Sequence, residues 1–270
     1  MCVVGAGAGC SLLVDTSGLE DGATTDPKLE AGVALPGDGG GTSDGGSSPT
    51  DGGGDAVAFD AGNAYAKAVL ADSPIAYYPL EETSGPAAAD VVGGRNGAWE
   101  GVAGLGVPGA VGRGASFDGE STRLVLPVGA FGFPGKAPYS VELWLRADTV
   151  DGQVRRIFEH ASAEQGGGYT LYFSKDFLLG SRGAPDGGTD GYAANTPPDV
   201  GQLRHYVLTF DGSVTRLYRD GVSGEAANAL LSLASNPGGR LVFGDGVTGQ
   251  FFKLRGVLDD ATGRWGVRIN

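Results

Sequence analysis

Short apolar runs separated by Gly, Asp and Pro fill the chain after residue 60, and this pattern constrains the fold more than any other feature. In the run at 139–146, Val141, Leu143 and Leu145 occupy every second position. A period of two places alternate side chains on opposite faces of a β-strand. No helix-length segment separates successive runs, so helical crossovers between parallel strands are not expected. The pattern predicts an all-β domain of two packed antiparallel sheets.

The segments expected to form strands are 75–80, 115–117, 124–126, 139–146, 156–161, 169–173, 177–180, 205–210, 214–219, 241–243 and 252–258. A short helix is expected at 61–70, because Tyr65 and Val69 lie four residues apart on one helical face. Asp72 and Pro74 follow and should end it. The Gly- and Asp-rich stretch 183–198 is expected to be a long loop, of the length that binding loops have.

The acidic charge is concentrated before the predicted sandwich. The formal net charge is −13, from 32 acidic and 19 basic residues. Residues 37–54 are mostly Gly, Asp, Ser and Thr, which bury too little apolar surface to offset the entropy of ordering. We expect an anchor region at 1–19, a disordered linker at 20–57 and a sandwich domain at 58–270. Clustered Lys and Arg are missing, so nucleic acid is not an expected partner; no run of about 20 apolar residues is present to span a membrane.

The first ten residues, MCVVGAGAGC, are open to several interpretations. Val3 to Gly7 resemble a strand entering a dinucleotide-binding turn, but no strand–helix–strand unit of about 30 residues follows. The small residues directly before Cys10 resemble the cleavage site of bacterial lipoproteins, which leaves a lipidated cysteine. The basic start and long apolar stretch of such signals are missing, as they would be if the true start lay upstream. A stub without function is the alternative. The lipoprotein interpretation predicts export and a lipid anchor on Cys10.

A series of segments occurs in a characteristic order between residues 65 and 260. They include ASFDG at 115–119, YSVELWLR at 139–146, HYVLTFDG at 205–212 and RLYRDG at 216–221. In this order they resemble the laminin-G-like, concanavalin A-like lectin/glucanase superfamily, found in many secreted bacterial proteins. The resemblance implies a jelly-roll sandwich. The chain departs from the family pattern after Asp260, where Trp265, Val267 and Ile269 still alternate as in a terminal strand.

The carboxylates do not form the pattern of a glycoside hydrolase, although such enzymes share this fold. A retaining glycosidase needs two carboxyl groups about 5 Å apart. Glu142 is alone on its expected strand, Glu159 and Glu164 flank an expected loop, and adjacent Glu81 and Glu82 would point apart on a strand. The sequence therefore favours a protein that is not an enzyme.

The two histidines do not indicate a catalytic triad or a zinc site. His160 is expected at a solvated strand end, and His205 is expected to be packed or to lie on an edge strand. Both cysteines, Cys2 and Cys10, lie at the N-terminus, so the domain offers no cysteine partner for zinc.

Calcium is the candidate cofactor, because related laminin-G-like and pentraxin-like domains often carry this ion on oxygen ligands from Asp-rich loops. The first and last strands of a jelly roll tend to be neighbours. Asp90 and either Asp259 or Asp260 are therefore the candidate ligands. Asp118, Asp211 and Asp220 are each followed by Gly and are expected to stabilise turns instead.

Three aromatic residues are candidates for stacking on the apolar face of a sugar: Trp99, Trp144 and Tyr192. Trp144 and Tyr192 each have a structural alternative. Trp144 lies opposite the apolar stripe of its strand and belongs to the core if both faces are covered. Tyr192 lies in the expected loop 183–198, where it could instead anchor the loop by packing.

The sequence as a whole favours a non-catalytic binding module, exported and lipid-anchored at a bacterial surface. Its partner would be a glycan or an extracellular protein, with membrane contact through the lipid anchor only. The alternative is a structural accessory domain that packs against a partner in a surface assembly. A glycoside hydrolase-like enzyme is the third interpretation. The sequence does not name the ligand.

Overall fold

The computed structural model describes residues 61, 63–162, 167–175, 177–183, 188–196, 199–233, 236–247, 249 and 252–263, with side chains up to residue 259. The expected anchor region 1–19 with Cys10, the expected linker 20–57 and the alternating residues at 265–269 lie outside the described residues. The boundaries of the three expected parts therefore stay predictions.

Sheet A has the strand order β14-β13-β12-β7-β18-β5-β4, with β1 paired to β18 and β15 paired to β13, all antiparallel. Its strands are β1 (Ala76–Tyr78), β4 (Gly104–Pro108), β5 (Arg113–Asp118), β7 (Tyr139–Ala147), β12 (Leu203–Phe210), β13 (Val214–Arg219), β14 (Val222–Ser223), β15 (Ala227–Asn228) and β18 (Arg255–Gly263). The pairing of β1 with β18 joins the first and last described strands, as the sequence predicted.

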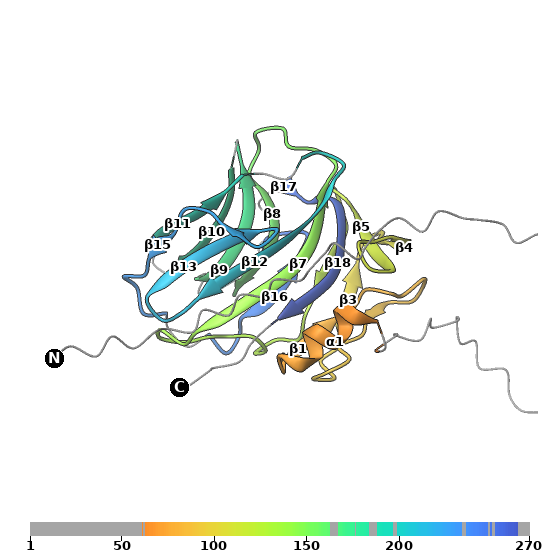
Figure 1. Ribbon diagram of the computed structural model, residues 1–270, viewed down its shortest axis with the longest axis horizontal. Helices are drawn as coiled ribbons and strands as arrows, with labels where there is room; N and C mark the ends of the chain where they lie inside the picture. The colour runs from red at the N-terminus through yellow and green to blue at the C-terminus, as the bar shows by residue number, and fades with distance from the viewer. Residues whose placement is uncertain are drawn as a thin grey trace, which may run out of the picture. The chain divides into compact units, whose positions relative to one another are not determined.

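Sheet B has the order β11-β10-β9-β8-β16-β6-β3-β2, and the short strand β17 pairs in parallel with β8. Its strands are β2 (Ala87–Ala88), β3 (Gly97–Glu100), β6 (Arg123–Val125), β8 (Arg155–Ala161), β9 (Gly168–Ser174), β10 (Phe177–Gly183), β11 (Thr189–Asn195), β16 (Arg240–Phe243) and β17 (Phe252–Lys253). The two sheets stack as layers (Figure 1). The fold is a jelly-roll sandwich, as expected.

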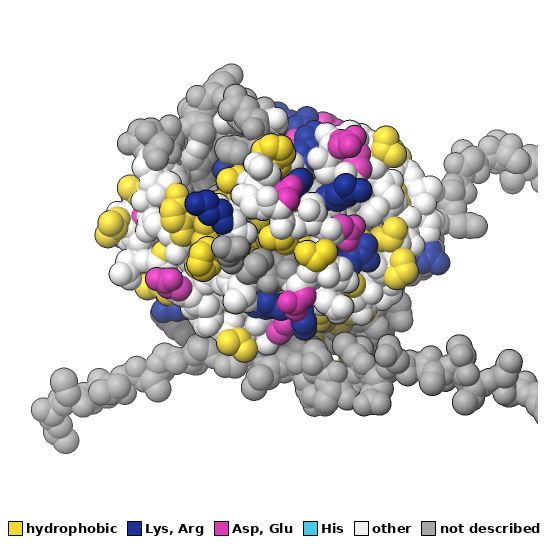
Figure 2. Space-filling model, turned by 90° about the horizontal axis from the view of Figure 1, so that it is seen from above, with side chains coloured by type: hydrophobic (Ala, Val, Ile, Leu, Met, Phe, Trp, Pro, Cys, Tyr) yellow, Lys and Arg dark blue, Asp and Glu magenta, His cyan; other side chains and the backbone are white. Residues whose placement is uncertain are grey.

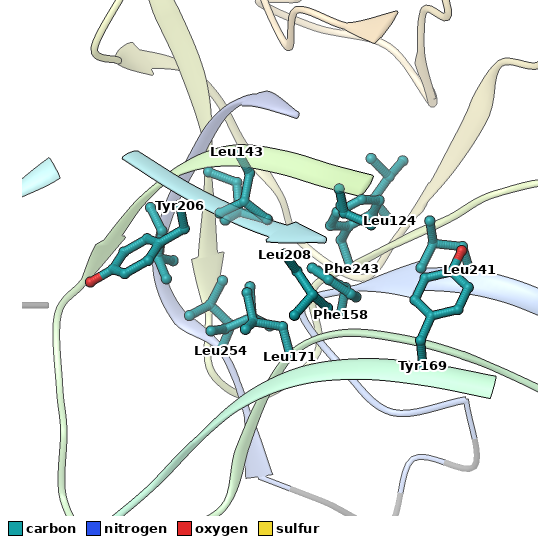
Figure 3. Packing of buried hydrophobic residues seen from close by; sticks show 14 of the residues in the cluster. Leu124, Leu143, Phe158, Tyr169, Leu171, Tyr206, Leu208, Leu241, Phe243 and Leu254 are labelled. Atoms are coloured by element: carbon teal, nitrogen blue, oxygen red, sulfur yellow. The ribbon is translucent and has the colours of Figure 1, made fainter. Parts of the chain in front are cut away.

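The core lies between the layers and is built from the alternating apolar residues of both sheets. Figure 3 shows Leu143 and Leu208 from sheet A facing Phe158, Leu171 and Phe243 from sheet B. Each of these side chains is at most 3% exposed. Burying one such side chain contributes about 1.5–3 kcal/mol, so the alternation in the sequence supplies the main driving force for stacking the sheets.

Helix α1 (Ala64–Ala71) packs on sheet A at the face turned away from the core. The side chain of Asn63 caps its first turn by accepting a hydrogen bond from the amide of Ala66 at 2.7 Å, and Asp72 caps its end. Tyr65 and Val69 are buried against Tyr77 in a second apolar cluster. The helix is one turn shorter at its start than the expected 61–70 but ends where the sequence predicted.

Every expected strand has a counterpart, and the run expected at 252–258 is divided by Leu254 into β17 and β18. The structure adds the strands β2, β3, β4, β11, β14 and β15, which the sequence pattern did not predict. The most consequential is β11, because 183–198 was expected to be a loop. Its sequence, TDGYAAN, has low strand propensity, and it is held as a strand by register with β10.

Candidate ligand-binding site

A pocket of about 190 Å³ lies at one end of strands β8 to β11, on sheet B. We call it the outer pocket; its lining includes Arg156, Glu159, Thr170, Tyr172, Ser181 and Tyr192. On β9, Tyr169, Leu171 and Phe173 belong to the core between the sheets. Since side chains alternate along a strand, Thr170 and Tyr172 point to the opposite face. The pocket therefore opens largely on the face of sheet B that turns away from sheet A.

Strand register aligns four of these residues in one row across the sheet. Glu159 on β8 is paired with Thr170 on β9, which is paired with Ser181 on β10, which is paired with Tyr192 on β11. Directly paired residues on neighbouring strands present their side chains on the same face, with Cβ atoms about 5 Å apart. The row therefore presents a carboxylate, two hydroxyls and a phenol side by side along the pocket.

A β-bulge in β8 brings Arg156 to the same face as Glu159. Residues three apart on a regular strand point to opposite faces. The register of β8 against β9 shifts between Arg156 and Phe158, which inserts one extra residue and lets Ile157 and Phe158 both enter the core. The Nε atom of Arg156 thus lies 3.5 Å from Oε1 of Glu159.

Neighbouring groups hold both charged side chains in place. Oε2 of Glu159 accepts a hydrogen bond from the amide of Val247 at 2.8 Å. The guanidinium of Arg156 lies over the ring of Tyr172, with 4.6 Å between its carbon and the ring centroid. Such a cation–π contact is worth about 0.5–2 kcal/mol. Neither Arg156 nor Tyr172 was predicted as a site residue from the sequence, and Glu159 was considered only as a catalytic acid.

Tyr192 is the exposed aromatic of the pocket, at 48% relative exposure. Its ring meets that of Tyr172 edge-on, with centroids 6.3 Å apart and an interplanar angle of 84°. Burial raises the pKa of Tyr172 well above its usual value, and the neighbouring Tyr192 raises it further. The hydroxyl of Tyr172 therefore stays protonated at neutral pH and can donate a hydrogen bond.

The strands that carry Ser181 and Tyr192 are fixed from behind by a buried ion pair. Arg182 and Asp190 lie on the core side of β10 and β11, with Nη1 of Arg182 2.5 Å from Oδ2 of Asp190. The other carboxylate oxygen of Asp190 accepts hydrogen bonds from the amides of Leu230 and Leu231. The pair thus ties the β10–β11 edge of the pocket to the chain near residue 230.

His160 is buried, whereas the sequence predicted that it would lie at a solvated strand end. Its side chain is 3% exposed and stacks on Tyr169, with ring centroids 5.1 Å apart and an interplanar angle of 6°. Burial lowers the pKa of His160 from 6.5 to about 4, so the ring is neutral at physiological pH. The core extends to the end of β8 because Tyr169 lies directly opposite His160.

The other two candidate aromatics lie against apolar neighbours. Trp99 on β3 packs against the core and meets Phe117 edge-on at 5.8 Å. Trp144 on β7 lies against α1, with Tyr65 at 6.3 Å and His205 at 5.1 Å between ring centroids. Neither residue lines the outer pocket. Sugar stacking by either stays a prediction, and the geometry favours Tyr192.

His205 is packed, which is one of the two environments that the sequence predicted for it. Its Nε2 atom lies 2.9 Å from Oε1 of Glu142, and the hydroxyl of Tyr65 donates to the same oxygen at 3.1 Å. Glu142 is 1% exposed. This cluster joins helix α1 to sheet A.

The candidate calcium ligands are engaged by backbone amides. Asp90 accepts hydrogen bonds from the amides of Tyr77, Val92, Gly93 and Arg95. Carboxylate oxygens saturated by N–H donors in this way do not fit the oxygen-rich shell of a calcium ion.

Asp259 is used in the same way, since its Oδ2 accepts from the amides of Ala110 and Val111. The backbone of Asp260 lies in β18, and its side chain is outside the described residues. Within the described ranges, no three His, Cys, Asp or Glu side chains are grouped so that they could hold a metal ion. Asp90 and Asp259 do not fit a shared calcium site, and calcium binding stays a prediction.

The remaining acidic candidates for catalysis also have structural partners. Glu81 accepts from the amide of Arg113, and Glu82 accepts from the amide of Ala89. Glu159 lies in β8, within the strand expected at 156–161, while Glu164 is outside the described residues. Among the described residues that line the outer pocket, Glu159 is the only carboxylate.

Apolar side chains elsewhere on the surface are scattered. Figure 2 shows the end of the molecule at the top of Figure 1, where apolar side chains are interspersed with Lys, Arg, Asp and Glu. The exposed apolar residues include Phe177 and Phe252, each at 53%. In the part of the chain that the structure describes, no helix is long and apolar enough to cross a membrane.

Comparison with protein families gives one match over more than half of the chain. A laminin G-type family model, described as the concanavalin A-like lectin/glucanases superfamily, matches residues 118–262. No curated protein matches the chain.

Several solved structures share the fold at low identity. The receptor-binding domain of botulinum neurotoxin C/D mosaic serotype is 12% identical, with a TM-score of 0.55 over 72% of this chain and 48% of that one. The binding domain of Paraclostridial Mosquitocidal Protein 1 is 13% identical, with a TM-score of 0.58 over 73% and 49%. Domain 4 of AbnA, a GH43 extracellular arabinanase from Geobacillus stearothermophilus solved with arabinotriose, is 16% identical, with a TM-score of 0.47 over 70% and 91%. The chain spans about half the length of the first two of these binding domains.

Proposed function

Because the chain belongs to the concanavalin A-like lectin/glucanases superfamily, we propose that it is a non-catalytic binding module that recognises an extracellular glycan through the outer pocket. A glycan attached to a surface protein fits the proposal equally well, and that protein would then be the partner. The fold is shared with the receptor-binding domain of a botulinum neurotoxin and the binding domain of Paraclostridial Mosquitocidal Protein 1, and this supports a recognition role.

The observation that carries the proposal is the row Glu159–Thr170–Ser181–Tyr192. Sugars bind proteins by stacking an apolar ring face on an aromatic side chain while their hydroxyls bond to polar groups. The row supplies both, because it ends in the half-exposed ring of Tyr192 and carries two hydroxyls and a carboxylate on the strands beside it. Ligand sites in general combine apolar or aromatic walls with a few placed polar groups.

A binding role without catalysis is favoured by the chemistry of the pocket. Glycoside hydrolysis by the common mechanism needs two carboxyl groups flanking the bond that breaks. The described lining supplies Glu159 alone, and one of its oxygens already accepts from Val247.

A glycan array probed with the purified chain tests the proposal. We expect reproducible binding that is lost in Tyr192→Ala. Phe177→Ala is the matched control, because it removes a similarly exposed aromatic from the opposite end of the neighbouring strand β10. Loss of binding in Phe177→Ala but not in Tyr192→Ala would contradict the assignment of the pocket. Absence of binding to every glycan would favour the structural accessory role instead.

Export and a lipid anchor on Cys10 are parts of the proposal that rest on the sequence around residues 7–10. Mass spectrometry of the protein isolated from its native membranes tests them. The expected result is a mature chain that begins at a diacylated Cys10. A soluble product with an unmodified Cys10 would contradict the anchor without affecting the pocket.

A further inference from the structure

The size and the charged groups of the outer pocket restrict the kind of sugar that it can bind. Its volume of about 190 Å³ is below the range of about 300–1,000 Å³ typical of sites for drug-sized ligands. A space of this size accommodates one sugar ring. The pocket therefore takes a single sugar unit.

The charged groups of the pocket form a fixed donor–acceptor pair. Oε1 of Glu159 lies 3.5 Å from Nε of Arg156, and its other oxygen is held by the amide of Val247. Arg156 is held in turn by the ring of Tyr172. Neither side chain is more than 15% exposed. A carboxylate accepts hydrogen bonds and a guanidinium donates them, so the pair presents one acceptor and one donor side by side.

Adjacent hydroxyls of a sugar complement this arrangement. Each hydroxyl is both a donor and an acceptor. One hydroxyl can donate to Glu159 while its neighbour accepts from Arg156, and the sugar ring then lies toward Tyr192. A single hydroxyl can also donate to Glu159 and accept from Arg156 at once, so removing each hydroxyl of the ligand in turn distinguishes the two arrangements.

The charge balance of the pocket disfavours an acidic sugar. Arg156 and Glu159 are the charged side chains of the described lining, and they offset each other. His160, which also lines the pocket, adds no positive charge because its burial keeps it neutral. A carboxylate on the ligand would face Glu159, and juxtaposed like charges weaken binding.

We infer that the outer pocket selects a neutral sugar unit with two adjacent hydroxyls, bound between Glu159 and Arg156 and stacked on Tyr192. This inference rests on the proposed function, since it names the class of glycan for the same site. Removing the charge of Glu159 should weaken the binding of a neutral sugar, whereas it should strengthen the binding of an acidic sugar.

The decisive experiment measures binding of the purified chain to neutral, sialylated and uronic acid-containing glycans, followed by calorimetry with the best ligand. Glu159→Gln keeps an acceptor for Val247 but removes the charge. We expect this variant to bind the neutral ligand about tenfold more weakly or worse, as for loss of a hydrogen bond to a charged group. Removing either of the two adjacent hydroxyls from the ligand should have an effect of similar size.

Glu120→Gln is the matched control, because Glu120 is an exposed carboxylate outside the pocket. The affinity of Glu120→Gln for the neutral ligand should equal that of the parent protein. The melting temperatures of Glu120→Gln and Glu159→Gln should show that both variants are folded. A preference for acidic glycans that Glu159→Gln strengthens would overturn the inference while leaving the proposed function intact. Failure to bind any glycan would overturn both.

Discussion

The buried ion pair between Arg182 and Asp190 should be the most sensitive polar element of the domain. Both side chains are 1% exposed. Arg182 also donates to the carbonyl of Gly135 at 3.0 Å and lies over the ring of Phe210, 3.7 Å from its centroid. Replacing Arg182 by Met keeps much of the side-chain volume but leaves the carboxylate of Asp190 in the core without its cation.

Removing one partner of a buried pair costs about 3–5 kcal/mol, because the other charge remains desolvated. For a domain of this size, 1 kcal/mol corresponds to about 2–4 °C in Tm. Arg182→Met should therefore lower Tm by roughly 6–20 °C. The double variant Arg182→Met/Asp190→Leu removes both charges and should recover part of this loss. Recovery should be incomplete, since the amides of Leu230 and Leu231 lose their acceptor at about 1–3 kcal/mol each.

Urea denaturation and thermal melting of the three variants measure these differences. Arg216→Met is the control, because its 2.7 Å pair with Asp211 is solvent-exposed and should be worth no more than about 1 kcal/mol. If Arg182→Met were as stable as Arg216→Met, the reasoning about burial would be refuted. A double variant less stable than Arg182→Met alone would show that the hydrogen bonds from the amides of Leu230 and Leu231 to Asp190 contribute more than the unpaired charge costs.

Two further predictions concern the titration of His160 and the hydrogen bonds accepted by Asp90. Burial lowers the pKa of His160 to about 4, so only the unfolded chain binds a proton on this residue between about pH 6.5 and 4. The contribution of His160 to the free energy of unfolding is complete above about pH 6.5 and should fall by about 3 kcal/mol as the pH decreases toward 4. Urea titrations at several pH values should show a weaker dependence of this free energy on pH for His160→Gln. An unchanged dependence would contradict the assignment. Asp90→Ala should cost about 2–3 kcal/mol, because the buried amide of Tyr77 and three other amides lose their acceptor. Melting curves should show this loss equally in calcium and in EDTA, whereas a loss seen only in calcium would identify Asp90 as a calcium ligand.

Much of the candidate site was within reach of the sequence. Glu159, Thr170, Ser181 and Tyr192 recur every 11 residues, which is the spacing expected when successive strands of similar length stack their outward positions in register. This spacing was not recognised in the sequence because the segment that forms β11 contains Gly and Ala where a strand normally has β-branched or aromatic residues. Tyr192 was consequently expected in a loop, although it was selected as a candidate.

The pairing of Arg156 with Glu159 was not predictable from alternation. A spacing of three places these residues on opposite faces of any regular strand. They share a face because β8 bulges, and the bulge exists because Ile157 and Phe158 both find space in the core against the opposite sheet. The burial of Trp144 likewise depends on helix α1, which is distant in sequence but packed on the same face of sheet A.

The sequence by itself determined the class of fold, since a period of two in apolar residues can be buried in water only by stacking one sheet on another. It also determined where most strands begin and end, because Gly, Asp and Pro interrupt the pattern at the turns. The tertiary structure alone decided which polar residues meet. Side chains at the pocket come from four strands, and their alignment depends on register and on one bulge, both of which are set by packing across the whole sandwich.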